Sequence, residues 1–195
     1  IALTEEKIGP VVGSPAVVGD VVYVCSSARE NGQTSGLVYA LDRTYGDELW
    51  VSPAFEGKLW VTPAVADASV FVSTLGGRIH QLDAATGVVQ PWTFDAGVGF
   101  VSSPLVQDGV VYVGAFDRML YAIPVGAQAP AWRFEADNWF WATPVAVDGV
   151  LYAPCLDGKL YAIRADSGAS AWSAPYDAGS PIAAPVVIAG DKAVV

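Results

Sequence analysis

The chain has 195 residues, of which 53% are hydrophobic and only 15% are charged, and this composition excludes a disordered chain. Ten basic and twenty acidic residues give a net charge of −10, so nucleic acid, whose phosphates attract Lys and Arg, is not an expected partner. No apolar run approaches the roughly 18 residues that a membrane-spanning helix needs, and no transmembrane segment is predicted.

The apolar residues form short runs that recur along the chain, and each copy is predicted to contain four strands. The first strands follow a proline and cover residues 16–18, 64–66, 105–107, 145–147 and 186–188. Tight turns of Gly and Asp come next, because these residues tolerate positive φ. Second strands cover residues 21–24, 70–72, 110–113 and 150–153, and third strands cover 37–41, 79–82, 120–123 and 160–163. The fourth strand of each copy carries a tryptophan.

Two sets of residues set the length of the repeat. The fourth-strand residues Trp50, Trp92, Trp132 and Trp172 are 42, 40 and 40 residues apart. The third-strand rings are 41, 41 and 40 apart, at Tyr39, His80, Tyr121 and Tyr161. A four-stranded unit that recurs about every 41 residues predicts an all-β fold, a β-propeller of four-stranded antiparallel blades.

The repeats divide the chain into four complete copies with a partial blade at each end. The copies lie near residues 15–62, 63–103, 104–143 and 144–184, and the partial blade strands cover 1–8 and 185–195. We expect a single propeller domain or a fragment of a longer propeller. Alternatively, the two ends share strands and build a fifth, incomplete blade. A missing third strand would leave an exposed edge, which favours the fragment and also allows self-association through blade edges.

The turn between the third and fourth strands carries the motif on which a family resemblance depends. Residues 41–50 read LDRTYGDELW, and residues 82–92 read LDAATGVVQPW. Both resemble the A-x-D-x-x-T-G-x-x-x-W tryptophan-docking signature of the PQQ-repeat (quinoprotein alcohol dehydrogenase-like) β-propellers. The resemblance implies that the four tryptophans Trp50, Trp92, Trp132 and Trp172 pack between adjacent blades. The fourth copy keeps Asp166, Ser167 and Gly168, whereas the third copy has residues 124–126, PVG, in this place.

In propellers, the loops between the second and third strands and the loops that join blades lie on one face. We expect a rim there that binds a ligand or partner, formed by Trp60, Trp139, Phe140, Trp141, Lys58 and Arg118, with Arg29 and Asn31 from an expanded loop at residues 26–35. Aromatic rings can stack on a flat ligand, a sugar ring or a peptide. Alternatively, Trp60 and Trp141 pack in the core and the charged residues are solvated loop tips. Successive side chains of an extended segment alternate in direction, so at least one ring of the 139–141 run is expected to be exposed.

Groups that carry catalysis are sparse in this sequence. The single histidine, His80, lies in the middle of a predicted strand, so no Ser/His/Asp set is expected. Cys25 and Cys155 form no CxxC pair and are expected to be small buried residues. No catalytic residue and no metal site is predicted.

The family resemblance implies two classes of function. Quinoprotein dehydrogenases bind PQQ with calcium or a lanthanide, and often place an adjacent Cys-Cys pair beside the quinone, which this sequence lacks. Similar repeats also occur in scaffold proteins of the bacterial envelope and in extracytoplasmic sensor modules of kinases. We therefore predict a non-catalytic scaffold, binding or sensor module of the cell envelope, periplasmic or extracellular, without a cofactor, whose rim binds a protein or a small molecule. The alternative is part of a PQQ-dependent dehydrogenase that holds PQQ with Ca²⁺.

Overall fold

The computed structural model describes residues 9–30, 33–190 and 192–195, and the chain divides into two compact units that part between Gly99 and Phe100. The regular structure of the described residues is strand throughout, arranged in antiparallel sheets. The predicted all-β fold of four-stranded antiparallel blades is therefore confirmed. Within the described residues there is no helix of the length and apolarity that crossing a membrane requires.

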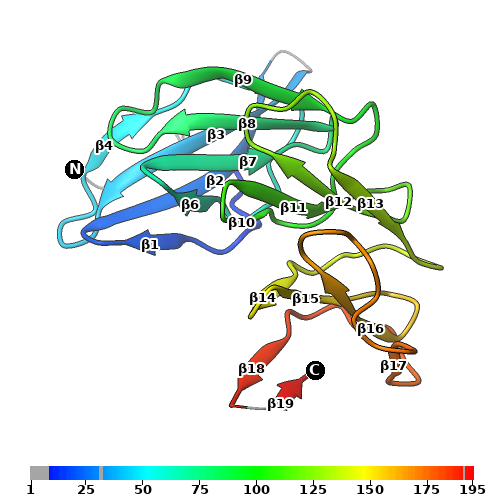
Figure 1. Ribbon diagram of the computed structural model, residues 1–195. Coiled ribbons are helices and arrows are strands. Elements are labelled where there is room, and N and C mark those ends of the chain that lie inside the picture. The colour runs from blue at the N-terminus through cyan, green and yellow to red at the C-terminus, as the bar shows by residue number, and fades with distance from the viewer. Residues whose placement is uncertain (1–8, 31–32, 191) are drawn as a thin grey trace. The chain divides into compact units, whose positions relative to one another are not determined.

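The first unit contains two sheets (Figure 1). The first sheet has the order β1-β2-β3-β4, with the short β5 paired to β3, and its strands are β1 (Ala16–Val18), β2 (Val21–Glu30), β3 (Gln33–Asp42), β4 (Glu48–Val51) and β5 (Phe55–Glu56). The second sheet follows chain order, with β6 (Ala64–Ala66), β7 (Ser69–Ser73), β8 (Arg78–Asp83) and β9 (Val89–Asp95).

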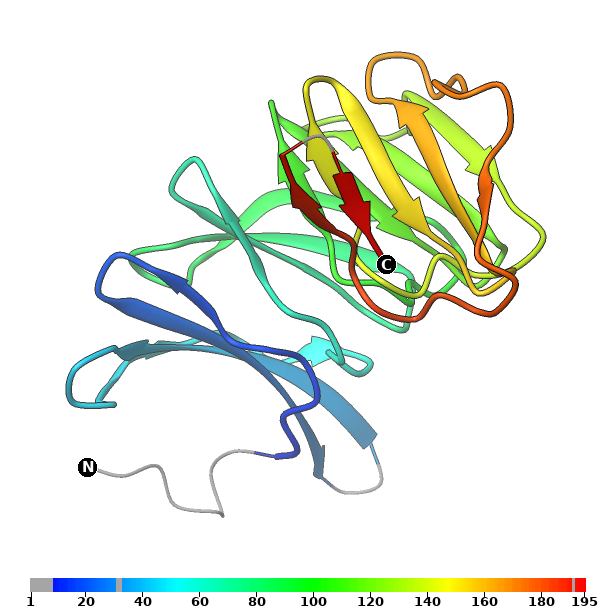
Figure 2. The ribbon, with the colours of Figure 1, turned by 90° about the horizontal axis from the view of Figure 1, so that it is seen from below.

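The second unit contains two four-stranded sheets and a two-stranded one (Figure 2). The strands of its first sheet are β10 (Leu105–Gln107), β11 (Val110–Gly114), β12 (Met119–Pro124) and β13 (Trp132–Glu135). Those of the next are β14 (Val145–Val147), β15 (Val150–Pro154), β16 (Lys159–Arg164) and β17 (Tyr176–Asp177). The final hairpin consists of β18 (Val187–Ala189) and β19 (Lys192–Val194).

The turn between the third and fourth strands is held by an aspartate side chain. Asp83 Oδ1 accepts hydrogen bonds from the Thr86 amide at 2.9 Å and the Thr86 hydroxyl at 2.8 Å. Gly87 then takes a φ of 71°, which favours glycine, and its amide donates to the Asp83 carbonyl at 2.9 Å. In the fourth repeat Arg164 takes the place of Asp83, since the Gly168 amide donates to its carbonyl. The retained Asp166 is therefore not the equivalent of the motif aspartate.

Tryptophans of one sheet contact this turn of the next sheet within the same unit. The Trp50 indole donates to the Ala84 carbonyl at 3.0 Å, and Trp132 donates to the Ala165 carbonyl at 2.9 Å. A Cβ added at Gly87 would lie 2.5 Å from the Trp50 ring. The turn glycine thus combines two roles, because it supplies positive φ and leaves room for the ring.

Two predicted elements differ from the structure. Of the expanded loop predicted at residues 26–35, residues 26–30 and 33–35 continue β2 and β3 as paired strands, because the antiparallel ladder extends to the pairs Arg29↔Thr34 and Glu30↔Gln33. Trp172 lies outside β17, although the fourth strand was expected to carry it. Regular pairing resumes at β17, directly after Pro175, which has no amide hydrogen for the ladder.

Each unit has its own apolar core. In the first unit it contains Cys25, Val38 and Leu59, and in the second it contains Phe140, Leu151 and Cys155. Both cysteines are free thiols and buried, as predicted. Burial is the main cause that raises the pKa of the Cys155 thiol to about 12, so the thiol stays protonated near neutral pH.

Candidate functional site

The two ends of each sheet differ in what they offer a partner. At one end, backbone hydrogen bonds tie the two hairpin turns of a sheet to each other, as between the Ala84 amide and the Ala68 carbonyl at 2.9 Å. At the other end lie the turns between second and third strands and the linkers that join sheets. Two linkers carry the predicted rim residues: the first linker (residues 57–63) and the third linker (residues 136–144).

The first linker holds Leu59 in the core and places Trp60 at the surface. Leu59 is fully buried, and its amide donates to the Ser27 hydroxyl at 3.0 Å. Trp60 is 43% exposed, and the Lys58 ammonium lies 4.4 Å from the centroid of its ring. The linker is fixed to the next sheet, because the Leu75 amide donates to the Lys58 carbonyl at 3.1 Å. Trp60 therefore presents a partly exposed ring on a backbone segment held by hydrogen bonds, and the Lys58 ammonium lies over this ring.

The third linker repeats this alternation with three aromatic residues. Phe140 is fully buried and packs against Phe134 and Tyr161, whereas Trp141 is 44% exposed. Trp139 is half-buried, and its indole donates to the Phe116 carbonyl at 3.0 Å. Phe140 thus belongs to the core and not to a surface rim, because the alternation of an extended segment turns it inward.

Phe116 is a surface aromatic residue that the sequence prediction missed. Its ring is 40% exposed and meets the Trp139 ring edge to face, with centroids 5.1 Å apart. The corresponding residues of the neighbouring copies are Leu75 and Leu156. The aromatic residue at a turn position where the neighbouring copies have leucine could have predicted this surface ring.

Arg118 follows in the same turn and adopts a backbone conformation that favours glycine. Its φ is 69°, and the corresponding residues of the second and fourth copies are glycines, Gly77 with a φ of 90° and Gly158 with a φ of 87°. A non-glycine residue in this region is uncommon and costs free energy. Its guanidinium pairs with Glu135 at 3.4 Å, and both side chains are more than half exposed, so this ion pair adds little stability.

The aspartates of these turns are engaged in structural hydrogen bonds. The Tyr161 hydroxyl donates to Asp157 at 2.6 Å, and the Tyr121 hydroxyl donates to Asp117 at 2.6 Å. Burial and then the Asp117 contact raise the pKa of Tyr121 to about 12. Both pairs brace the turn against its third strand.

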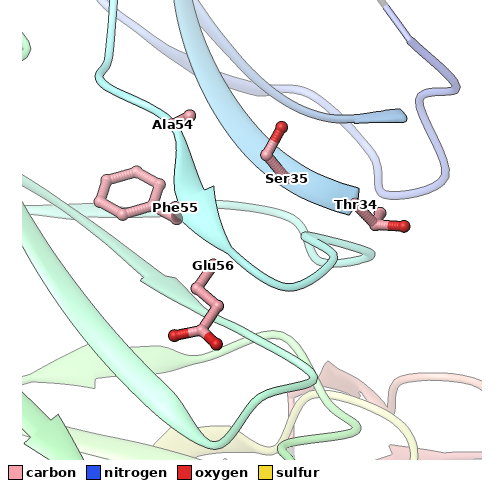
Figure 3. Close-up of a pocket in the computed structure, with 5 residues that line it drawn as sticks. All are labelled: Thr34, Ser35, Ala54, Phe55 and Glu56. Carbon is pink, nitrogen blue, oxygen red and sulfur yellow. The ribbon is translucent and has the colours of Figure 1, made fainter. Parts of the chain in front are cut away.

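A hollow of about 460 Å³ lies where β3 meets β5, beside the long hairpin of the first unit. Thr34, Ser35, Ala54, Phe55 and Glu56 line it, as Figure 3 shows. Glu56 also pairs with Arg78 at 2.9 Å. Of the residues predicted in the expanded loop, Arg29 belongs to β2, and Asn31 lies outside the described residues.

His80 contacts Phe55, which lines this hollow, and provides a pH test of the fold. The Phe55 ring stacks on it at a centroid distance of 4.4 Å, and burial together with the nearby Arg78 charge lowers its pKa to about 4. Above pH 6.5 the His80 side chain is neutral in both the folded and the unfolded state. Between pH 6.5 and about 4, His80 binds the proton only in the unfolded chain. Stability is therefore expected to fall through this window. Because the ring is partly exposed, the loss is about 1 kcal/mol, or about 2–4 °C in Tm.

The control for this prediction is His80→Tyr, since the other three repeats carry tyrosine at the same position. Thermal unfolding of both proteins at pH 7 and at pH 4.5 measures the difference. An equal fall in Tm for both proteins would show that His80 does not contribute.

A calcium-bound quinone would need several oxygen donors grouped around the metal ion. Within residues 9–30, 33–190 and 192–195, no three His, Cys, Asp or Glu side chains are grouped so that they could bind a metal ion. The carboxylate set that such a metal needs is thus not brought together within these residues. That the chain works without a cofactor stays a prediction.

Comparisons with known proteins agree with this architecture. The family model PQQ_2, described as outer membrane protein assembly factor BamB, matches residues 34–195. A comparison with curated proteins found no significant match.

Solved structures show the same fold. BamB from Moraxella catarrhalis superimposes with a TM-score of 0.73 at 22% identity, over 95% of this chain and 55% of that one. Quinohemoprotein alcohol dehydrogenase from Comamonas testosteroni superimposes with a TM-score of 0.70 at 16% identity, over 93% of this chain and 38% of that one. The computationally designed Ika4 protein superimposes with a TM-score of 0.63 at 11% identity, over 80% of this chain and 91% of that one. The predicted PQQ-type β-propeller fold is confirmed, and the chain spans about half the length of that BamB.

Proposed function

The chain belongs to the PQQ_2 family of outer membrane protein assembly factor BamB, and we propose that it is a non-catalytic module that binds protein partners in the bacterial cell envelope. Each unit has a binding surface at the loop end of its own sheets. In the first unit it contains Lys58 and Trp60, and in the second unit it contains Phe116, Trp139 and Trp141. Arg118 adds a charged group beside the aromatic residues of the second unit.

One observation carries this proposal: large aromatic rings are exposed on backbone segments that are themselves fixed. Trp60 and Trp141 are 43% and 44% exposed, while Leu59 and Phe140 beside them are fully buried. A ring held in this way loses little conformational entropy when a partner covers it. Tryptophan is also among the residues that contribute most to protein interfaces.

The family description supports a partner that takes part in outer-membrane protein assembly. The mechanism needs no chemical step. The sheets hold the linkers rigid, the rings supply apolar contact area, and polar residues such as Arg118 and Asp137 fix the orientation of the partner.

Photo-cross-linking tests this proposal. A photoreactive amino acid placed at position 60 or 141 is irradiated in envelopes of the source bacterium, and cross-linked proteins are identified by mass spectrometry. We expect a protein of outer-membrane assembly to be cross-linked from both positions. The matched control is position 88, because Val88 is 59% exposed but lies in the turn at the opposite end of its sheet.

Equal cross-linking from position 88, or none from positions 60 and 141, would contradict the binding surface. The non-catalytic part is tested separately with purified protein, PQQ and Ca²⁺. Dye-linked oxidation of an alcohol with sustained turnover would show a quinoprotein dehydrogenase instead.

A further inference from the structure

The first and third linkers are equivalent residue by residue. Their backbones make the same hydrogen bond to the following turn, from the Leu75 amide to the Lys58 carbonyl at 3.1 Å and from the Leu156 amide to the Trp139 carbonyl at 3.0 Å. The next residue is fully buried in both linkers, and the one after it is an exposed tryptophan, Trp60 or Trp141. Lys58 and Trp139 therefore occupy the same position in the repeat.

This equivalence shows that the two exposed rings differ in one respect. Lys58 places its ammonium 4.4 Å from the centroid of the Trp60 ring. At Trp141 the corresponding position holds Trp139, and no Lys or Arg of the described residues lies over the Trp141 ring. The Trp60 ring thus has a cation over its face, whereas the equivalent Trp141 ring has none from the described residues.

The nearby cations of the second unit are engaged elsewhere. Lys159 pairs with Asp137 at 2.8 Å, and Arg118 pairs with Glu135 at 3.4 Å. Residues 100–195 contain nine acidic and five basic residues, a net charge of −4. An approaching cation therefore meets a favourable average field as well as an uncovered aromatic face.

We infer that Trp141 is a cation-binding position for a partner polypeptide, and that a Lys or Arg side chain of the partner takes the place that Lys58 fills over Trp60. Trp139, two residues before Trp141 in the chain, and Phe116, which contacts Trp139, also have partly exposed rings. They favour a partner segment in which an apolar or aromatic residue stands next to the basic one. The inference rests on the proposed function and names the chemistry of its partner.

The test uses the intact chain and a short peptide in place of the unidentified partner. The capped peptide Gly-Lys-Phe-Lys-Gly is titrated while the indole N–H resonances of the tryptophans are followed by NMR. We expect a saturable shift of the Trp141 resonance, assigned from its loss in Trp141→Leu. The leucine variant keeps an apolar side chain and should bind the peptide about two- to fivefold more weakly, as an exposed cation–π contact implies.

Two further variants move the cation. Trp139→Lys places an ammonium in the position that Lys58 has and should reduce peptide binding at Trp141 by a similar factor. Lys58→Ser uncovers the Trp60 ring and should add a peptide-dependent shift of its indole resonance. The matched peptide with glutamate in place of lysine should leave both resonances unchanged.

Equal affinity of the wild type and Trp141→Leu would overturn the inference, and so would an equal response to the glutamate peptide. The peptide titration does not need the natural partner, so it can succeed where envelope cross-linking fails. Peptide binding without envelope cross-linking would support the cation site and contradict the assembly role. Cross-linking without peptide binding would support the assembly role and contradict the cation site.

Discussion

Replacement of Phe140 by alanine should lower the free energy of unfolding by about 3–5 kcal/mol, the range found for large aromatic residues that leave a cavity. Phe140 is fully buried, and its ring packs against Phe134 and Tyr161 at centroid distances of 6.3 and 5.7 Å. It also anchors the third linker, so the loss extends to the segment that presents Trp141. Urea unfolding followed by circular dichroism measures the change.

The matched control is Trp141→Ala, one residue further along the chain. Its ring is 44% exposed, so truncation should cost less, about 2 kcal/mol, because part of its area already contacts water. Equal losses for the two variants would mean that Trp141 is as important to the core as Phe140. The aromatic surface of the second unit would then be structural.

The second large effect is expected at the turn glycines that contact tryptophan. Gly46 and Gly87 have the same φ of 71°, but a Cβ at Gly87 would lie 2.5 Å from the Trp50 ring, whereas nothing lies within 4 Å at Gly46. Gly46→Ala should therefore cost only about 1 kcal/mol for the unfavourable backbone. Gly87→Ala adds the displacement of the ring and should cost about 2–4 kcal/mol.

The two substitutions replace the same residue type at the same φ and in equivalent turns of two sheets. The difference between their unfolding free energies therefore isolates the contact with tryptophan. Intrinsic fluorescence gives a second measurement, since Gly87→Ala should change the environment of Trp50 and Gly46→Ala should not. Identical free energies for the two variants would show that the ring moves aside without cost. Gly168 in the second unit repeats the Gly87 arrangement with Trp132, where a Cβ would lie 2.7 Å from the ring.

These effects connect the fold with the proposed binding surface. The linkers are short and their backbones are bonded to the following turn, as at Lys58 and Trp139. A surface built on such segments changes little when a partner binds. Mutations at Phe140 should consequently reduce both stability and partner binding, whereas mutations at Trp141 should reduce binding with a smaller loss of stability.

Much of the architecture could be predicted from the sequence alone, for a definite physical reason. The propeller repeats a local unit, so the period of the tryptophans, the β-branched runs and the Gly-Asp turns all follow from neighbours within about 41 residues. The strands Ala16–Val18, Leu105–Gln107 and Val145–Val147 begin and end where the pattern predicts. The burial of Cys25 and Cys155 was also correctly inferred from their type.

What the sequence determined by itself was therefore the repeat, the strands and the apolar character of the linkers. Only the tertiary structure decided which rings of those linkers face water, because burial depends on the neighbouring sheet, which a single copy does not specify. It placed Phe140 in the core, left Trp141 exposed and added Phe116 to the surface. It also placed Lys58 over Trp60, a contact whose absence at Trp141 is visible only when the two linkers are compared in space.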